Sequence, residues 1–354
     1  MHNPLVKVFA VRILVIRLSS LGDVVLSTPV VRLLRRCFPA ATIDVAVAKE
    51  FAPVWLHNPR VDRVIAVDRS RSAWDMAQAV RKELASYYDV VVDLQRNARS
   101  IALRWGRAGF VLRSSKHRIE KLLLVWAKRK PLVQTHVVER YIHALAPLGI
   151  SNDGEGLEVW LPEERIMPIY PPLVRERPAQ RTIGIAPGSR HATKQWLPER
   201  FAEVAQHFQR QGWKVVLLGS RQEHSLCATI AKQLDPKRTE NAAGVSLEET
   251  IRLLDSCHVV LSNDSAAVHL AAARRVPVAV VYGSTVPEFG FTPYRVPSCI
   301  IEASVSCRPC THIGRSRCPR GHFACMRSIE SKQVAEQLQR FVAATVLSGE
   351  DQSR

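Results

Sequence analysis

Residues 11–36 read VRILVIRLSSLGDVVLSTPVVRLLRR, and this stretch decides the fold class. Its first eight residues are largely β-branched or apolar, as a buried strand requires. The polar turn 19–23 follows, where Gly22 permits a tight strand-to-helix connection. The pattern beyond the turn predicts a helix from about residue 24 to residue 36. A strand that leads into a helix in this way is the repeating unit of an α/β fold.

The same alternation continues on both sides of a proline-rich stretch, residues 162–178. Alternating strands and helices predict parallel sheets with right-handed crossovers, and a short proline-rich stretch suits an interdomain linker. Before the linker we expect strands at 43–47, 63–67 and 89–94, with a helix at 73–85. After it we expect strands at 182–188, 214–219, 259–264 and 276–283, and helices at 198–211, 222–234, 247–255, 265–274 and 331–346.

The chain therefore predicts two Rossmann-like domains. We place an N-terminal domain at 1–170, a C-terminal domain at 180–330, and a final helix and tail at 331–354. The length of 354 residues agrees, since single cores rarely grow beyond about 250–300 residues. An apolar content of 47% excludes a mainly disordered chain.

No apolar run approaches the roughly 20 residues that a membrane-spanning helix needs. Lys7, Arg12 and Arg17 interrupt the first apolar stretch, so the N-terminus does not resemble a signal peptide. We therefore expect a cytoplasmic protein.

The net charge of +18 is concentrated in one segment. Residues 96–130 hold eleven Lys or Arg residues and one acid, Glu120, and so carry +10 of that total. Such a segment predicts an anionic partner. Within it, residues 119–130 place six apolar residues between cations, which fits either contact with a membrane interface or an ordinary amphipathic helix with a solvated basic face. Nucleic acid is disfavoured, because neither an aromatic stacking pattern nor a known binding module is present.

Ligands of open α/β sheets bind where strands end, so the residues that follow each strand are the candidates for a site. Asp23 follows the first strand, either as a helix-capping carboxylate or as a general base. No G-x-G-x-x-G pattern occurs there, which argues against a nicotinamide enzyme.

Two further strand ends lie in the second half. Residues 188–194 combine small residues, hydroxyls and cations, and we interpret them as a phosphate cradle in which Lys194 and Ser189 contact a diphosphate, the alternative being a solvated loop. Residues 263–269 follow another strand, and their Asn or Asp could cap a helix. His269 shares a helix face with Ser265, as a structural or a catalytic residue.

Four cysteines, Cys307, Cys310, Cys318 and Cys325, lie within nineteen residues. Their spacing is compatible with a structural zinc site, with His312 and His322 as alternative ligands. Reduced thiols that pack a loop, or disulfides, are the other interpretations. We interpret the remaining cysteines as isolated thiols.

Five motifs then occur in order along the chain. They are RLSSLGDVVLSTPVV (17–31), DLQRNARS (93–100), HVVERY (136–141), PGSRHATKQWLPERF (187–201) and LSNDSAAVHLAAA (261–273). Together they resemble glycosyltransferase family 9, the bacterial ADP-heptose:lipopolysaccharide heptosyltransferase family. The resemblance implies a GT-B fold, with two Rossmann-like domains facing across a cleft.

The resemblance also implies an activity. The protein would be an inverting glycosyltransferase that moves a heptose-like sugar from an ADP-sugar to a lipopolysaccharide inner-core acceptor, without an obligatory metal ion. Asp23 would be the general base. The anionic acceptor would bind the N-terminal domain, at the cytoplasmic face of the inner membrane, and a monomer is the default state. Ala266 replaces a glycine that is usual in the family, which leaves another sugar donor open.

The candidate site residues, from the motifs and from the basic segment, fall into two sets. Those expected to bind the donor are Ser189, Arg190, Lys194, Glu223, Asp264, Ser265 and His269. Those expected to bind the acceptor are Ser20, Gly22, Arg96, Arg99, Lys116, Arg118 and Lys121. A nucleotide-sugar epimerase or hydrolase of the same fold is the rival enzyme class, and a non-catalytic glycolipid-binding or metal-binding protein is the third.

Overall fold

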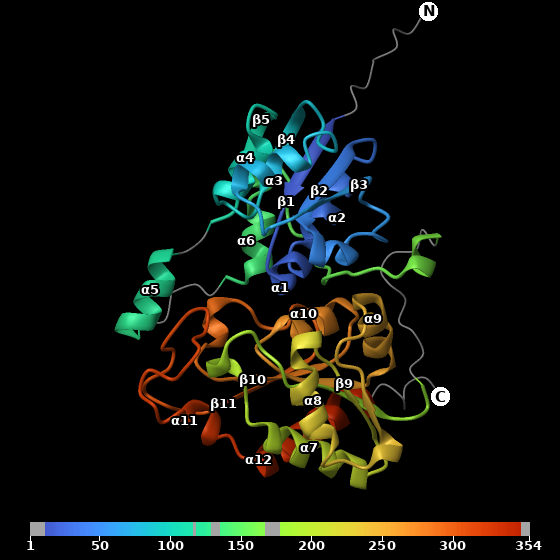
Figure 1. Cartoon of the computed structure of the whole chain (residues 1–354), viewed down its shortest axis with the longest axis vertical. Helices are drawn as coiled ribbons and strands as arrows, with labels where there is room; N and C mark the ends of the chain where they lie inside the picture. The colour runs from blue at the N-terminus through green and yellow to red at the C-terminus, as the bar shows by residue number, and fades with distance from the viewer. Residues whose placement is uncertain (1–10, 116–117, 129–134, 167–177, 348–354) are drawn as a thin grey trace, which may run out of the picture. The chain divides into compact units, whose positions relative to one another are not determined.

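The computed structural model describes residues 11–115, 118–128, 135–166 and 178–347. These residues form two compact units (Figure 1). The N-terminal unit contains the described residues up to 115 together with 138–155 and 162–166, and the C-terminal unit contains the rest. The chain thus passes between the units at several points, whereas the sequence suggested one linker at 162–178, of which 167–177 lie outside the described residues.

A five-stranded parallel sheet, in the order β3-β2-β1-β4-β5, organises the N-terminal unit. Its strands are β1 (Arg12–Ile16), β2 (Thr42–Ala48), β3 (Arg63–Val67), β4 (Tyr88–Asp93) and β5 (Ala108–Arg113). The strand predicted near residue 11 is confirmed as the central strand β1. The strand order reverses between β1 and β4, and such a switch point is where open α/β sheets bind ligands.

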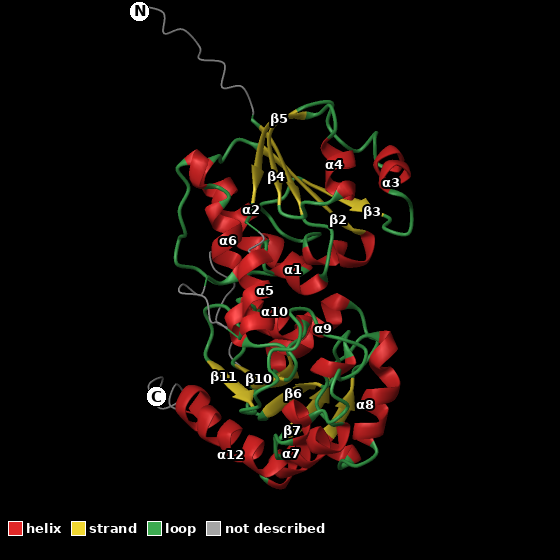
Figure 2. Ribbon diagram, turned by 90° about the vertical axis from the view of Figure 1, so that its left-hand side faces the viewer, coloured by secondary structure: helices red, strands yellow, loops and turns green. Residues whose placement is uncertain are grey.

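Helices cover both faces of this sheet (Figure 2). They are α1 (Leu21–Val25), α2 (Thr28–Cys37), α3 (Ala73–Ala79), α4 (Ala98–Arg104) and α6 (Val137–His143), with 3₁₀ turns at Lys49–Val54, Ala146–Leu148 and Pro162–Ile166. Side chains from α3 and α4, such as Met76 and Leu103, pack with the sheet residues Leu14 and Val91 in a buried cluster.

The single helix predicted over 24–36 is wrong, because two helices occupy these residues. The Ser27 hydroxyl donates to the Val24 carbonyl at 2.7 Å, where the first helix ends. Pro29 then lies in the first turn of α2. Proline lacks the N–H that an interior helical position would use, so it favours the start of a new helix.

A buried ion pair joins α2 to the chain beyond α6. Arg32 donates to both carboxylate oxygens of Asp153, at 2.9 and 3.0 Å, and both side chains are almost fully buried. Arg36 adds a third contact at 3.2 Å. This bidentate geometry attaches residues 138–155 to the N-terminal unit.

The C-terminal unit repeats the architecture with a six-stranded parallel sheet, in the order β11-β10-β9-β6-β7-β8. Its strands are β6 (Thr182–Ala186), β7 (Lys214–Leu217), β8 (Thr239–Asn241), β9 (Val259–Asn263), β10 (Val278–Tyr282) and β11 (Ser298–Glu302). Here the order reverses between β6 and β9, the strands that precede the two predicted donor motifs.

The helices of this unit are α5 (Arg118–Ala127), α7 (Pro198–Arg210), α8 (His224–Ala231), α9 (Leu247–Ser256), α10 (Ala266–Ala273), α11 (Ala324–Arg327) and α12 (Ser331–Val342). Short turns lie at Ala192–Lys194, Arg221–Glu223, Pro236–Arg238 and Pro287–Phe289, and a π-turn at Ala343–Leu347. A large core that includes Trp196, Phe201 and Phe208 packs α7 and α12 against the sheet. No helix within the described ranges is long and apolar enough to span a bilayer.

Three strands of the structure were not predicted, and all lie at or near sheet edges. Residues 108–113 of the basic segment form the edge strand β5, in which Leu112 alone is buried. The other two are β8, which reads TEN, and β11. An edge strand needs no continuous apolar run, so the pattern that reveals buried strands is absent from it.

Candidate active site

Asp23 lies in the first turn of α1, directly after the central strand β1. Its Oδ2 accepts hydrogen bonds from the backbone N–H and hydroxyl of Ser20, at 3.1 and 2.9 Å. Its Oδ1 lies 2.7 Å from Nη2 of Arg17 and accepts from the Tyr141 hydroxyl at 3.2 Å. Four donors therefore hold both oxygens, while about a fifth (20%) of the side chain stays exposed.

These contacts keep Asp23 ionised. Burial alone would raise the pKa of the Asp23 carboxyl, but the Arg17 guanidinium and the Ser20 hydrogen bonds outweigh burial and lower the pKa. The pKa of the Tyr141 phenol is raised by its burial and by the Asp23 carboxylate, so Tyr141 remains a hydrogen-bond donor. The Arg17 guanidinium also lies 5.4 Å from the centre of the Tyr141 ring. Sequence reasoning did not identify Arg17 or Tyr141 as site residues, although both lie in quoted motifs.

A cavity of about 520 Å³ opens beside this turn, at the carboxyl ends of the N-terminal strands. It is lined by Leu18, Ser19, Lys49, Glu50, Asp68, Arg69, Ser70, Gln95, Asn97 and Arg99. The Gln95 side-chain carbonyl accepts from the backbone N–H groups of Leu18 and Ser19, at 3.0 and 3.2 Å, and thereby fixes the wall next to Asp23. The lining holds three cations and two carboxylates, Glu50 and Asp68, and Glu50 pairs with Arg69. Its net positive charge and its amide and hydroxyl groups suit an anionic, hydroxylated ligand.

Two of these cations were missed from the sequence. Lys49 follows β2 directly, and Arg69 lies two residues after β3. Both occupy the strand-end positions at which a site is expected, so the strand-end rule was the signal that could have found them.

The residues predicted to bind the acceptor are dispersed in the structure. Ser20 and Gly22 belong to the Asp23 turn, and Arg99 lines the cavity. Arg96 does not line the cavity, and its Nη1 donates to the carbonyl of Ser114. Lys116 lies outside the described residues. Arg118 begins α5 in the C-terminal unit, where Lys121 lies 5.6 Å from the centre of the Phe291 ring.

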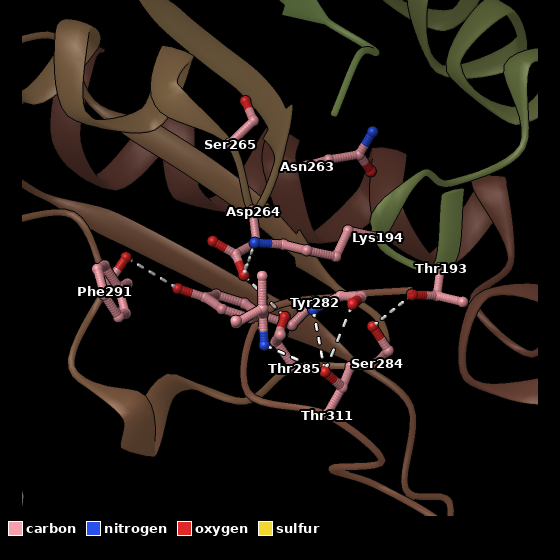
Figure 3. A network of polar contacts seen from close by, with 12 residues as sticks. Thr193, Lys194, Asn263, Asp264, Ser265, Tyr282, Ser284, Thr285, Phe291 and Thr311 are labelled. Carbon is pink, nitrogen blue, oxygen red and sulfur yellow. Dashed lines mark hydrogen bonds and ion pairs between the residues drawn. The ribbon is translucent and has the colours of Figure 1, made fainter. Parts of the chain in front are cut away.

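In the C-terminal unit, the two predicted donor motifs meet across the switch point between β6 and β9. Lys194 Nζ lies 2.6 Å from Asp264 Oδ2, and this oxygen also accepts from the Thr285 hydroxyl at 2.7 Å (Figure 3). Asn263 fixes the motifs to each other: its amide donates to the Pro187 carbonyl at 2.7 Å and accepts from the Trp196 N–H at 3.0 Å. A cation is thus held between two loops that begin at adjacent strand ends.

Four other donor candidates lie on the same two segments, the loop after β6 and the start of α10. Ser265 precedes α10, and its hydroxyl lies 3.2 Å from that of Ser262. His269 is buried within α10. On the loop after β6, Ser189 is buried and Arg190 is exposed.

A second layer of hydroxyls lies below the pair and was also missed. The Ser284 hydroxyl donates to the Thr193 hydroxyl at 2.9 Å, and the Ser284 N–H donates to the Thr193 carbonyl at 3.2 Å (Figure 3). Ser284 and Thr285 follow β10, so their signal was again a pair of polar residues at a strand end.

Glu223 lies against the predicted phosphate loop. Its Oε2 accepts from the backbone N–H and hydroxyl of Ser220, at 2.7 and 2.9 Å. A Cβ placed on Gly188 would come within 1.9 Å of Glu223 Oε1. Gly188 therefore leaves the space that the Glu223 carboxylate occupies.

This contact predicts the effect of a single methyl group. Gly188→Ala is expected to displace the flexible end of the Glu223 side chain from its Ser220 hydrogen bonds and so to destabilise the C-terminal unit by about 0.5–1.5 kcal/mol. The matched control is Gly156→Ala in the same unit, where an added Cβ meets only the Arg295 Cβ at 4.0 Å. Scanning calorimetry of the two variants measures the difference. Equal transition temperatures for both would contradict the proposed packing of Glu223 on Gly188, and Glu223→Ala in the Gly188→Ala background should restore part of the loss.

Of the three interpretations of the cysteine-rich segment, the structure favours reduced thiols. No group of three or more His, Cys, Asp or Glu side chains converges on a metal position in the described part of the chain. All eight cysteines are free thiols, so no disulfide forms either. Burial raises the pKa of the Cys325 thiol to about 11, as expected for a thiol that packs a loop.

A family model and a curated relative both match this chain over most of its length. The model of glycosyltransferase family 9 (heptosyltransferase) matches residues 77–319. Lipooligosaccharide heptosyltransferase 2 of Haemophilus influenzae is 25% identical over 302 residues, which cover 78% of this chain and 84% of the relative.

Solved structures agree with this match. The family 9 glycosyltransferase of Veillonella parvula has a TM-score of 0.73 at 23% identity, and the alignment covers 94% of this chain and 98% of that structure. E. coli ADP-heptose lps heptosyltransferase II has a TM-score of 0.69 at 22% identity, over 94% and 99% of the two chains. The similarity to these structures and the two parallel sheets confirm the GT-B fold.

Proposed function

Since the chain belongs to glycosyltransferase family 9, we propose that it transfers a heptose-like sugar from an ADP-sugar to a lipopolysaccharide inner-core acceptor. The chain is a glycosyltransferase, and curated relatives about 25% identical to it are lipopolysaccharide or lipooligosaccharide heptosyltransferases. The observation that carries the proposal is the Asp23 carboxylate, which four donors hold in its ionised form beside a cavity of net positive charge.

In this proposal Asp23 is the general base. Its carboxylate accepts the proton of an acceptor hydroxyl while that oxygen attacks the anomeric carbon and the bond to the ADP oxygen breaks. Such a single displacement inverts the anomeric centre. Arg17 and Tyr141 act through Asp23, by fixing its orientation and keeping its charge.

The acceptor is an anionic sugar of the inner core, bound in the cavity of the N-terminal unit. Lys49, Arg69 and Arg99 contact its carboxylate or phosphate groups, and Gln95 and Asn97 its hydroxyls. The donor diphosphate binds at Lys194, with Ser189, Arg190, Ser265 and the N-terminus of α10 around it. Asp264 orients Lys194, His269 supports α10, and Glu223 lies on the adenosine side.

We further propose that the protein works as a monomer, without a catalytic cofactor, at the cytoplasmic face of the inner membrane. The transfer itself is tested by incubating the purified protein with ADP-heptose and de-acylated inner-core oligosaccharides, with mass spectrometry of both substrates. A mass increase of one heptose on the oligosaccharide supports the proposal. Turnover of the donor in the absence of any acceptor favours the epimerase or hydrolase class instead.

The lowered pKa of Asp23 predicts the pH dependence of transfer. The base works only when deprotonated, so a lowered pKa keeps the base active as the pH falls through the ordinary carboxyl range. Arg17→Met removes the positive charge that opposes the effect of burial on the pKa of Asp23. The fall of kcat at acid pH should therefore occur at higher pH in this variant. The measurement is kcat against pH at saturating donor and acceptor.

Arg17→Lys is the control for this shift, because it keeps a positive charge beside Asp23. Its acid limb should stay near that of the unmodified protein. An identical pH profile for all three proteins would exclude Asp23 as the titrating base.

A further inference from the structure

The α5 helix carries an apolar stripe on its exposed side. Ile119, Leu122, Leu123 and Trp126 are 73%, 57%, 48% and 79% exposed. Their spacing of i, i+3, i+4 and i+7 places them on one helix face. In a globular protein this face normally packs on the core, so its exposure marks an interaction surface.

The opposite side of α5 is already packed. Leu124 is buried against Val286 and Phe289, and Val125 and Phe291 pack around them. The helix is thus attached to the C-terminal unit, and the stripe is the face that this packing leaves outward.

A basic loop continues the surface beyond the end of α5. Residues 303–329 contain five arginines and neither Asp nor Glu. Lys128, which follows α5, donates to the carbonyls of Cys307 and Pro309, and so joins the helix to this loop. Figure 1 shows α5 at the margin of the C-terminal unit. Ile313 is 55% exposed on the loop, and Arg315, Arg317 and Arg320 are exposed after it.

We propose that this docking surface, made of the α5 stripe and the loop arginines 315, 317 and 320, binds the interface of an anionic phospholipid bilayer. Apolar side chains, Trp126 foremost, enter the boundary between headgroups and acyl chains, and the arginines lie at the lipid phosphates. This proposal rests on the proposed function, since a glycolipid acceptor is displayed at a membrane surface. The α5 stripe and the three loop arginines are the part of the chain that would contact that membrane.

The charge of the surface decides between a bilayer and a second copy of the chain. In a symmetric dimer the same patch lies on both subunits, so a single interface would collect the loop arginines of both copies. Like charges brought together in this way oppose association. Phospholipid headgroups of negative charge complement the arginines instead.

Co-sedimentation with phosphatidylglycerol vesicles tests the proposal, with phosphatidylcholine vesicles as the neutral comparison. The full-length protein should bind the anionic vesicles, and added salt should weaken the binding. Leu122→Gln combined with Trp126→Ser should lower the partition coefficient at least about tenfold. Replacement of Arg315, Arg317 and Arg320 by Gln should lower it about fivefold for each charge.

The matched control is Trp74→Ser, which removes an exposed tryptophan (58%) on α3 of the other unit and should leave vesicle binding unchanged. Trp126→Phe should keep binding but lose quenching of its fluorescence by brominated lipids. Transfer to a de-acylated, soluble acceptor should be the same in every variant, so that a failure of the docking surface is separable from a failure of the proposed function.

Two outcomes overturn the inference. One is vesicle binding that is unaffected by either set of substitutions. The other is a concentration-dependent dimer in sedimentation velocity that the Leu122→Gln, Trp126→Ser protein no longer forms, which would assign the stripe to a second copy of the chain.

Discussion

Asp23→Asn is expected to lower kcat for sugar transfer by about 10²–10⁴-fold, the range that removal of a general base produces. The amide has almost the volume of the carboxylate, but its single oxygen keeps only one set of hydrogen bonds, either those from Ser20 to Oδ2 or that from Tyr141 to Oδ1. It cannot take up a proton from the acceptor hydroxyl. The measurement is steady-state transfer, together with the affinity for ADP by calorimetry, which should change less than about twofold because the proposed donor residues lie in the other unit.

The matched control for this variant is Asp75→Asn. Ser72 and Asp75 at the start of α3 repeat the arrangement of Ser20 and Asp23, with the Ser72 hydroxyl 2.7 Å from Asp75 Oδ2. Asp75 is exposed and lies away from the cavity, so it shares the capping role of Asp23 without a proposed chemical role. If kcat falls equally and only slightly in the two variants, Asp23 acts as a helix cap and not as the general base.

Asp23→Asn also leaves the Arg17 guanidinium without its carboxylate partner. Removal of one partner of a buried charge pair destabilises a protein, so a lower melting temperature is expected. Transfer must therefore be measured well below that temperature. Arg17→Lys, which leaves the carboxylate intact, shows how much of any loss of activity comes from the altered ion pair alone.

The sequence predicted the central elements of both sheets well because buried parallel strands are continuous apolar runs. The strands β1, β4 and β9 agree with their predicted positions to within a few residues. The edge strand β5 was missed because its residues are mostly exposed. Strand ends also made Asp23 and Lys194 candidates, and the structure places each of them after a strand at which the strand order reverses.

The partners of those residues could not be predicted in the same way. Tyr141 reaches Asp23 from 118 positions along the chain, and Thr285 reaches Asp264 from another strand end. Such pairs depend on how the helices and loops pack, which local patterns do not determine. The cysteine spacing left zinc, thiols and disulfides open, and in the described residues no three such side chains converge on a metal position.

Lys194→Met is expected to weaken ADP binding by about 10–100-fold, the equivalent of one charge-assisted hydrogen bond. Lys194 Nζ lies 2.6 Å from Asp264 Oδ2, and both side chains are largely buried. Without the ammonium group, the Asp264 carboxylate would face the diphosphate directly and repel it. The measurement is calorimetric titration with ADP at two salt concentrations.

A surface pair of the same length provides the control. Lys214 Nζ lies 2.6 Å from Glu240 Oε2, but both side chains are about 40% exposed and lie on β7 and β8. Lys214→Met should change ADP affinity less than about twofold, since exposed ion pairs contribute little. Asp264→Asn in the Lys194→Met background should recover part of the affinity, because it removes the repulsion and leaves the missing cation as the remaining loss. Unchanged affinity in Lys194→Met would place the diphosphate elsewhere in the C-terminal unit.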